Sequence, residues 1–202
     1  NWWRGEVILT ILKSILDHNE VFVKEKQYEQ YITTKFPNKK LVIVTCMDTR
    51  LIELLPKAMN LKNGDAKIIK NAGAIISHPF GSIMRSIIVA LYELQAKEVC
   101  VVGHHGCGMA GLQSSSILSK AEERGVDMEK VETVEFAGVN VNSWLTGFAK
   151  VEESVKHSVE MIKKHPLLPP TTPIHGLIIC PETGKLDVVV NGYEETEQNQ
   201  GE

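Results

Sequence analysis

The 202-residue sequence lacks a long apolar run and a surplus of basic residues. No uncharged apolar stretch reaches the roughly 18 residues that a membrane-spanning helix needs, so no membrane partner is expected. Lys and Arg together number 22 against 25 Asp and Glu, which gives a formal net charge of −3. This balance provides no basic surface for nucleic acid, so that class of partner is not expected either.

Cysteine is also scarce. Four cysteines in 202 residues do not make the disulfide framework typical of small secreted domains. A reducing and therefore cytoplasmic location is expected. Cys100 lies inside an apolar run and Cys180 ends another, so both are predicted to be buried small hydrophobes.

Length and composition favour a single compact domain. The chain is 43% hydrophobic and 23% charged, an ordinary globular balance. We expect an N-terminal helical arm over residues 1–24, with 1–5 as a candidate cloning remnant, one α/β domain over 25–193 and a polar tail over 194–202. An amphipathic stripe on the arm consists of Val7, Ile8, Ile11, Leu12, Ile15 and Leu16.

Two strand-like apolar runs, residues 41–45 and 98–102, each end at a polar motif. Helical patterns over 51–58 and 81–96 flank a further strand at 66–69. Alternation of strands and helices predicts a mostly parallel central β-sheet flanked by helices, with right-handed crossovers. Such sheets bind ligands outside the carboxyl ends of their strands, which is where both motifs fall.

The remainder of the chain extends this sheet. Residues 107–123 are predicted to form a helix that opens directly from the second motif, and 151–164 another. Short helices are expected within 127–148. Residues 175–180 and 186–191 are predicted to form a hairpin that closes the sheet with a C-terminal antiparallel strand.

The two motifs hold the donors of a metal site. The first reads Cys46-Met47-Asp48-Thr49-Arg50 and the second His104-His105-Gly106-Cys107. Two thiolates and an imidazole favour Zn²⁺ over Mg²⁺ or Ca²⁺, which prefer oxygen ligands. A catalytic zinc site keeps three protein ligands and leaves the fourth position to water, whereas a structural zinc knot would need a fourth protein ligand. We therefore predict one catalytic zinc ion held by Cys46, His104 and Cys107.

With these motifs the chain resembles a β-class carbonic anhydrase over roughly residues 25–193. Four further segments carry the resemblance: Leu61–Ala66 with Ile69–Gly73, Arg85-Ser86, His165–Leu168 and Pro173–Leu177. Lys70 stands where an Arg is usual, and Ala74 where a second Gly is common. The resemblance implies reversible hydration of carbon dioxide to bicarbonate and a proton, by attack of zinc-bound hydroxide.

Asp48 and Arg50 are the predicted catalytic pair. Asp48 can accept a hydrogen bond from the nucleophile and aim its lone pair, while Arg50 can hold the carboxylate by a bidentate pair. In some members of the family, the resemblance implies, this Asp becomes a fourth metal ligand in a closed state. Two alternatives stay open: a hydrolase of carbonyl sulfide or carbon disulfide on the same ligands, and a catalytically idle zinc-binding protein.

Three further predictions concern the substrate pocket, the proton relay and the oligomeric state. Asn71, Ala72 and Gly73 are substrate-pocket candidates, with a plain turn as the competing interpretation. His105 and His78 are candidates for a proton relay, against an ordinary hydrogen-bonded histidine. The apolar stripe of the arm, together with the resemblance, implies a homodimer or a higher homo-oligomer.

Overall fold

A five-stranded β-sheet dominates the computed structural model, which describes residues 2–194 and, for residues 2–9, the backbone alone. The predicted polar tail from residue 195 onward lies outside the described residues. The chain divides after Thr34 into two compact units. The second unit contains the sheet and both polar motifs.

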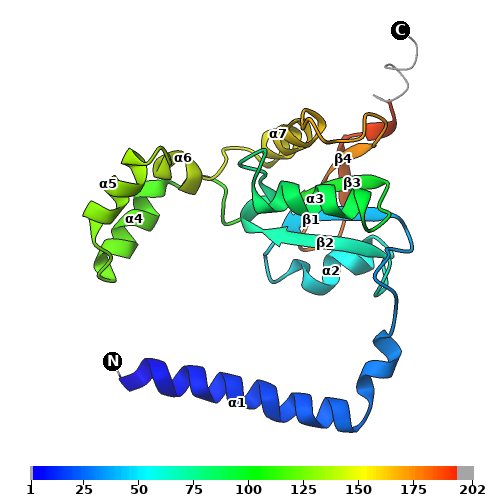
Figure 1. Ribbon diagram of the computed structural model, residues 1–202, viewed down its shortest axis with the longest axis horizontal. Helices are drawn as coiled ribbons and strands as arrows, with labels where there is room; N and C mark the ends of the chain where they lie inside the picture. Colours follow the sequence, from blue (N-terminus) through cyan, green and yellow to red (C-terminus); the bar gives the residue numbers. More distant parts are fainter. Residues whose placement is uncertain (1, 195–202) are drawn as a thin grey trace. The chain divides into compact units, whose positions relative to one another are not determined.

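The second unit alternates strands and helices as the sequence predicts (Figure 1). Its elements are β1 (Leu41–Cys46), α2 (Leu51–Ala58), β2 (Ala66–Asn71), η2 (Ala72–Ala74), α3 (Ser82–Tyr92), β3 (Glu98–His104), α4 (Ser114–Glu123), α5 (Met128–Phe136), α6 (Val141–Leu145), α7 (Val151–Lys163), β4 (Ile174–Ile179) and β5 (Leu186–Val190).

The strand order is β2-β1-β3-β4-β5. All neighbouring pairs are parallel except β4 and β5, which run antiparallel. The predicted fold class is therefore confirmed. Strand order reverses between β1 and β3, because the chain leaves β1 toward β2 on one side and leaves β3 toward β4 on the other.

The two central strands are buried on both faces, which explains their nearly continuous β-branched sequences. Alternate residues of β1 enter different hydrophobic clusters: Val42 and Val44 pack with residues of α3 and α7, while Ile43 packs with residues of α2. This alternation follows from the two-residue period of a strand. Helices therefore cover both faces of the sheet and hold the ends of β1 and β3 in place.

One predicted boundary is wrong. The helix expected to open at Cys107 begins at Ser114, and the intervening residues form turns. Gly106 and Gly111 adopt positive φ angles of 61° and 72°, a conformation that glycine tolerates and a right-handed helix does not. Cys107 therefore projects from a turn.

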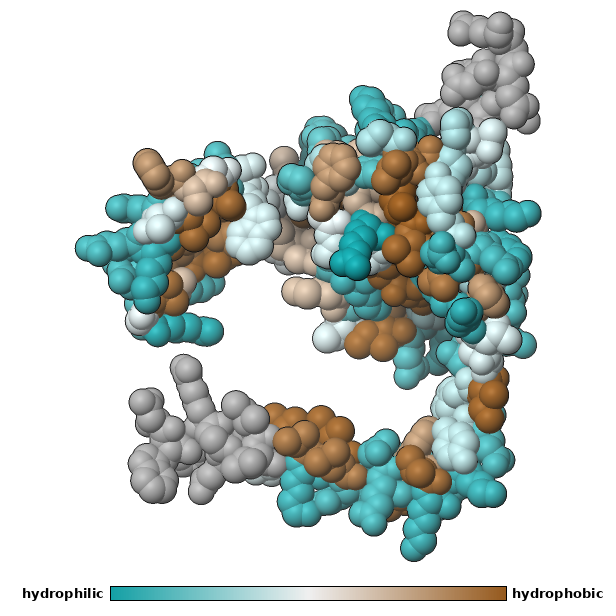
Figure 2. Space-filling model, viewed as in Figure 1, coloured by the Kyte–Doolittle hydropathy of each residue, from teal (hydrophilic) through white to brown (hydrophobic). Residues whose placement is uncertain are grey.

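The first unit contains α1 (Trp2–Lys24) and η1 (Gln27–Tyr31). Among residues 10–34 no side chain is buried, and the apolar stripe of α1 is about half exposed from Ile11 to Leu16. Figure 2 shows these apolar atoms as brown surface on the helix. The stripe residues Val7 and Ile8 lie outside the described side chains. No described helix combines the length and the apolarity that crossing a membrane would require.

Helix α2 provides a test of the packing beneath the first motif. Leu55 is 1% exposed and Ile52 is 58% exposed on the same helix. We expect Leu55→Ala to lower the free energy of unfolding by about 2–5 kcal/mol, because it leaves a cavity in the cluster that contains Cys46 and Cys107. Ile52→Ala is the matched control, with a change of about 0.5 kcal/mol or less. Urea denaturation followed by circular dichroism measures both, and equal losses would contradict the packing described.

Candidate metal centre

The parallel pairing of β1 with β3 brings the two polar motifs to one edge of the sheet. The register pairs Thr45 with Val102, so the carboxyl ends of the strands lie side by side. A buried hydrogen bond of 2.9 Å from the Thr45 hydroxyl to the Val102 carbonyl ties the strands together just before the motifs begin. This is the edge at which open α/β sheets bind ligands.

Three buried side chains converge there: Cys46, His104 and Cys107. Their potential ligand atoms all lie within 4.8 Å of one another, and the two sulfur atoms are 3.9 Å apart. Nε2 of His104 is buried and has no hydrogen-bond partner among the described residues. A buried polar atom without a partner is unfavourable, and a cation between the three donors would satisfy it. The donor set is the soft nitrogen and sulfur type that zinc takes.

A backbone hydrogen bond on the nitrogen that faces away from the sulfur atoms fixes the orientation of the His104 imidazole. Nδ1 of His104 lies 2.8 Å from the backbone carbonyl of His105, to which it donates as N–H. In the neutral imidazole Nε2 is then the unprotonated nitrogen, and it lies on the side of the sulfur atoms. A second hydrogen bond of this kind is the usual support of a histidine that binds a metal.

The two thiols differ in acidity. Burial raises the pKa of Cys46, but the nearby imidazole of His104 and hydrogen bonds from the backbone N–H groups of Asp48 and Gly73 outweigh it and bring the value down to about 7. Burial raises the pKa of Cys107, and the N–H of Met109 opposes this only in part. Cys46 is thus the thiol that ionises more readily.

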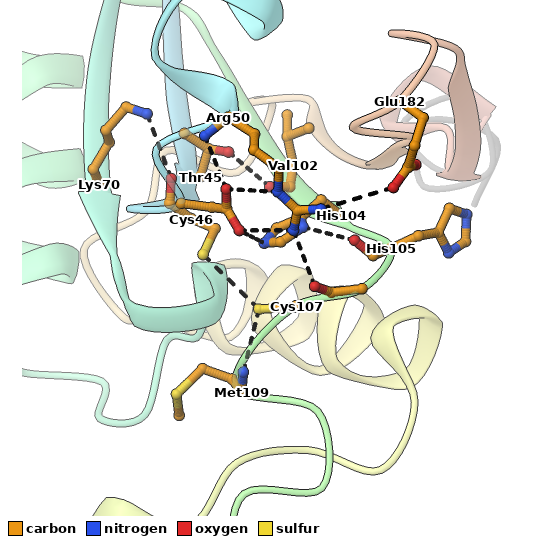
Figure 3. A network of polar contacts seen from close by, with 12 residues as sticks. Thr45, Cys46, Arg50, Lys70, Val102, His104, His105, Cys107, Met109 and Glu182 are labelled. Atoms are coloured by element: carbon orange, nitrogen blue, oxygen red, sulfur yellow. Dashed lines mark hydrogen bonds and ion pairs between the residues drawn. The ribbon is translucent and has the colours of Figure 1, made fainter.

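Asp48 and Arg50 form a bidentate pair. Figure 3 shows Arg50 close to Cys46 and His104. Arg50 donates from Nε to Oδ1 at 3.0 Å and from Nη2 to Oδ2 at 2.9 Å, and its backbone N–H also donates to Oδ1. These hydrogen bonds hold the pKa of Asp48 well below its usual range, so the side chain is a carboxylate at neutral pH. Its Oδ2 lies 3.7 Å from Nε2 of His104.

Arg50 has two further partners that the sequence did not indicate. Its Nη2 donates to the carbonyl of Gly106 at 3.0 Å, and its Nη1 lies 3.7 Å from Oε1 of Glu182. Glu182 also accepts a hydrogen bond from the thiol of Cys180, which is half-buried, so the prediction of full burial for this cysteine is wrong. Glu182 follows β4 in an exposed turn, and no local pattern marks it. Only the sheet order places that turn next to Arg50.

Lys70 also lies at this site. Its Nζ is 3.5 Å from the backbone carbonyl of Cys46.

The two predicted relay histidines lie in different surroundings. His105 is exposed and directly follows His104. His78 is exposed as well, and its Nδ1 accepts a hydrogen bond from the backbone N–H of Phe80. The structure thus gives His78 a local structural contact, and a relay role for either residue stays a prediction.

Residues 71–73 lie at the carboxyl end of β2, beside the first motif. Asn71 pairs with Cys46 in the strand register, and its carbonyl accepts from the N–H of Met47. Its side-chain nitrogen donates to the carbonyl of Ile75, while Oδ1 is buried and has no partner within the described part of the chain. Gly73 has φ 76°, and its backbone N–H is one of the groups that lower the pKa of Cys46. The segment therefore borders the metal centre.

Comparison with known proteins identifies relatives of the whole domain. A model of the carbonic anhydrase family matches residues 41–186, which include both motifs. The chain is 72% identical over 183 residues to the Bacillus subtilis (strain 168) protein named "Putative carbonic anhydrase YvdA", covering 91% of this chain and 93% of that protein.

Two further relatives extend the comparison to structure and to other substrates. The crystal structure of beta-carbonic anhydrase isoform I from Trichomonas vaginalis superposes with a TM-score of 0.82 at 34% identity, covering 90% of this chain and 98% of that chain. A carbon disulfide hydrolase of Acidithiobacillus thiooxidans is 28% identical over 158 residues, covering 74% of this chain and 76% of that protein.

The convergence of the three donors leads to a test of metal binding. We expect one tightly bound zinc ion per chain, detected by elemental analysis after dialysis. The double variant Cys46→Ala/Cys107→Ala should lose it, because one imidazole alone is a weak site. Cys100→Ala/Cys180→Ala is the matched control that removes the other two cysteines and should keep the metal. Full occupancy in the Cys46/Cys107 variant would refute the assignment.

Proposed function

This chain belongs to the β-class carbonic anhydrase family, and from that premise we propose that it catalyses the reversible hydration of carbon dioxide to bicarbonate and a proton. One observation carries the proposal. An ionised carboxylate, Asp48, lies beside a buried group of two thiols and an imidazole, with Oδ2 3.7 Å from Nε2 of His104. A purely structural metal site has no use for such an acceptor.

Zinc held by Cys46, His104 and Cys107 would lower the pKa of a water molecule in the fourth position and so supply a nucleophile near neutral pH. The protein then has to orient that nucleophile. Oδ1 of Asp48 accepts two hydrogen bonds from Arg50, whereas Oδ2 accepts one and is the oxygen nearer to His104. Oδ2 therefore keeps a lone pair to accept an O–H and to direct the attacking lone pair toward carbon.

Arg50 controls where Asp48 points. It holds both carboxylate oxygens, and its other contacts to the Gly106 carbonyl and to Glu182 fix the guanidinium itself. If Asp48 turned away from Arg50 toward the three donors, it would take the position that water needs and close the site. We propose that the bidentate pair keeps the site open, because two charge-assisted hydrogen bonds favour the present rotamer.

We assign Asn71, Ala72 and Gly73 to the wall of the substrate pocket. The support is their place beside Cys46 and the buried Oδ1 of Asn71, for which the described residues provide no partner. Proton transfer to solvent is proposed to use His105, which is exposed next to a metal ligand. His78 remains the second candidate.

A second function is favoured by one relative, the carbon disulfide hydrolase. Carbon disulfide and carbonyl sulfide have the same linear arrangement around an electrophilic carbon, so the same nucleophile could attack either. A catalytically idle zinc-binding protein is the third possibility. Only the substrate assay below separates the three.

We also propose a cytoplasmic location and a homodimer or higher homo-oligomer. All four cysteines are free thiols, which suits a reducing compartment. Among the described side chains of their own unit, residues 10–34, no layer covers the half-exposed apolar side chains on α1 from Ile11 to Leu16. Apolar surface left in water costs about 25 cal/mol per Å², so a second copy that covers it is favoured.

Substitution of the catalytic pair tests the mechanism. Asp48→Asn should keep zinc and lower the rate of carbon dioxide hydration by about 10- to 100-fold, because the amide can turn a donor toward the nucleophile. Arg50→Ala should also lower the rate, since it frees Asp48 to approach the metal. Asp187→Asn, at an exposed carboxylate paired with Lys185, is the control. Stopped-flow hydration measures all three, and parental rates in both site variants would rule out this mechanism.

The same metal-loaded protein should be tested with carbonyl sulfide and carbon disulfide. Turnover of these substrates without carbon dioxide hydration would establish the hydrolase instead. Full zinc occupancy with no turnover of any of them would establish the idle protein.

The oligomer is tested by sedimentation velocity on the intact chain and on one truncated before Lys24. We expect the intact chain to be a dimer or larger, and the truncated chain to dissociate more readily because it lacks the apolar stripe. A monodisperse and fully active monomer of the intact chain at micromolar concentration would contradict the proposal.

A further inference from the structure

A long excursion of the chain begins and ends beside the second motif. It runs from residue 111 to 147, contains α4, α5 and α6, and extends away from the sheet in Figure 1. Its two ends meet in a parallel bridge between Ala110 and Phe148. Ala110 lies three positions after Cys107 and Phe148 lies forty-one positions after it. The bridge therefore brings the end of the excursion back to a point three residues from a candidate metal ligand.

Backbone hydrogen bonds close the excursion on Met109. Phe148 donates to the Met109 carbonyl at 3.1 Å, and Gly111 donates to the Phe148 carbonyl at 2.8 Å. Gly147 donates to the Leu112 carbonyl at 2.9 Å. Residues 147 and 148, where the chain returns from the excursion, are thereby held against residues 109–112.

Gly147 makes this approach possible. A Cβ atom at position 147 would lie 1.8 Å from the carbonyl oxygen of Met109 and 2.9 Å from its carbonyl carbon. Both are backbone atoms, which cannot swing aside as the end of a side chain can. Any residue larger than glycine must therefore displace Met109 or open the bridge.

Met109 in turn lies against groups that surround both thiols. Its N–H lies 3.5 Å from Sγ of Cys107 and donates to it. Its side chain packs directly on Gly73, where a Cβ would lie 3.0 Å from the Met109 Cγ. The backbone N–H of Gly73 is one of the groups that lower the pKa of Cys46, which places that N–H on the side of the Cys46 sulfur. One residue thus supports an N–H donor on each of the two sulfur atoms.

From these contacts we infer that Gly147 is a positioning residue for the metal centre, acting through Met109 on the two thiolates. The absence of a side chain at 147 lets the returning chain fix the Met109 backbone, and Met109 fixes the N–H groups that face Cys107 and Cys46. N–H donors to a thiolate stabilise its charge and set its orientation. The inference rests on the proposed zinc site, and it adds a residue of the excursion to the machinery that shapes it.

The test replaces Gly147 by Ala and measures metal affinity directly. Chelator competition with zinc should show an affinity about 10- to 100-fold lower than that of the parental protein, the usual effect of losing an outer-shell contact. With Co²⁺ in place of zinc, the thiolate-to-cobalt charge-transfer absorption should shift, because the hydrogen bonds on sulfur change. A variant that merely loosens the fold away from the site would leave this absorption in place.

Gly125→Ala is the matched control. Gly125 belongs to the same excursion and has φ 86°, so alanine strains the backbone there, but no atom lies within 4 Å of the added Cβ. This variant should keep parental zinc affinity and the parental cobalt spectrum. Equal losses in the Gly125 and Gly147 variants would overturn the inference in favour of general loosening of the excursion.

A second pair of variants keeps the test decisive if Gly147→Ala fails to fold. Met109→Ala removes the packing on Gly73 without adding an atom, and it should lower zinc affinity about tenfold and shift the cobalt absorption. Met109→Leu restores the bulk and should restore both. Parental affinity and spectrum in Gly147→Ala, or in Met109→Ala when the former does not fold, would refute the role. If the parental protein itself binds neither metal, the proposed zinc function fails first and the inference falls with it.

Discussion

The parallel pairing of β1 with β3 is the constraint on which the site depends. Each strand ends where its motif begins, and the register that sets Thr45 opposite Val102 brings Cys46 and His104 to the same edge. The buried hydrogen bond between these strands resists a slip of the register. A shift by one residue would turn every side chain of β1 to the other face of the sheet. The donors would then no longer converge, even with an unchanged sequence.

If both thiols ionise, charge favours a cation among the converged donors, as the proposed zinc site requires. Two thiolates and the Asp48 carboxylate carry three negative charges, of which Arg50 neutralises one. The remaining pair of charges in a buried site is unfavourable without a divalent ion. The two thiols are unequal, because the His104 imidazole and backbone N–H groups lower the pKa of Cys46 while burial raises that of Cys107. One thiol is prepared to ionise, and the second is expected to lose its proton only as the metal binds.

The sequence predicts most of the fold and the donor set, because both depend on local pattern. Apolar runs end abruptly at residues with metal-binding side chains, and the alternation of strands with helices fixes a parallel sheet. The prediction fails where structure depends on turns and distant contacts. Glycines at 106 and 111 delay the helix to Ser114, because their positive φ angles are incompatible with a right-handed helix.

Contacts between distant segments are harder to predict. Glu182 reaches Arg50 only because β4 lies beside β3 in the sheet. Gly147 lies in a poorly periodic segment, and its closeness to Met109 depends on how a chain of three helices returns. Neither contact can be predicted from the spacing of residues along the chain. A pattern can indicate which residues bind the metal, whereas the residues that hold those ligands in place come from the tertiary structure.

The choice of substrate is a property of the surroundings and not of the donors. Carbon dioxide, carbonyl sulfide and carbon disulfide all present an electrophilic carbon, so under the proposed function the same metal ligands and Asp48 would serve each of them. Discrimination among these substrates must then come from the walls of the substrate pocket, because sulfur is larger than oxygen and needs more room there. Within the second unit the segment from Asn71 to Gly73 borders the donors, and the side chain of Met109 presses on it. Substitutions that reshape this wall should therefore alter the ratio of substrates, while those at Asp48 and Arg50 should slow all of them together.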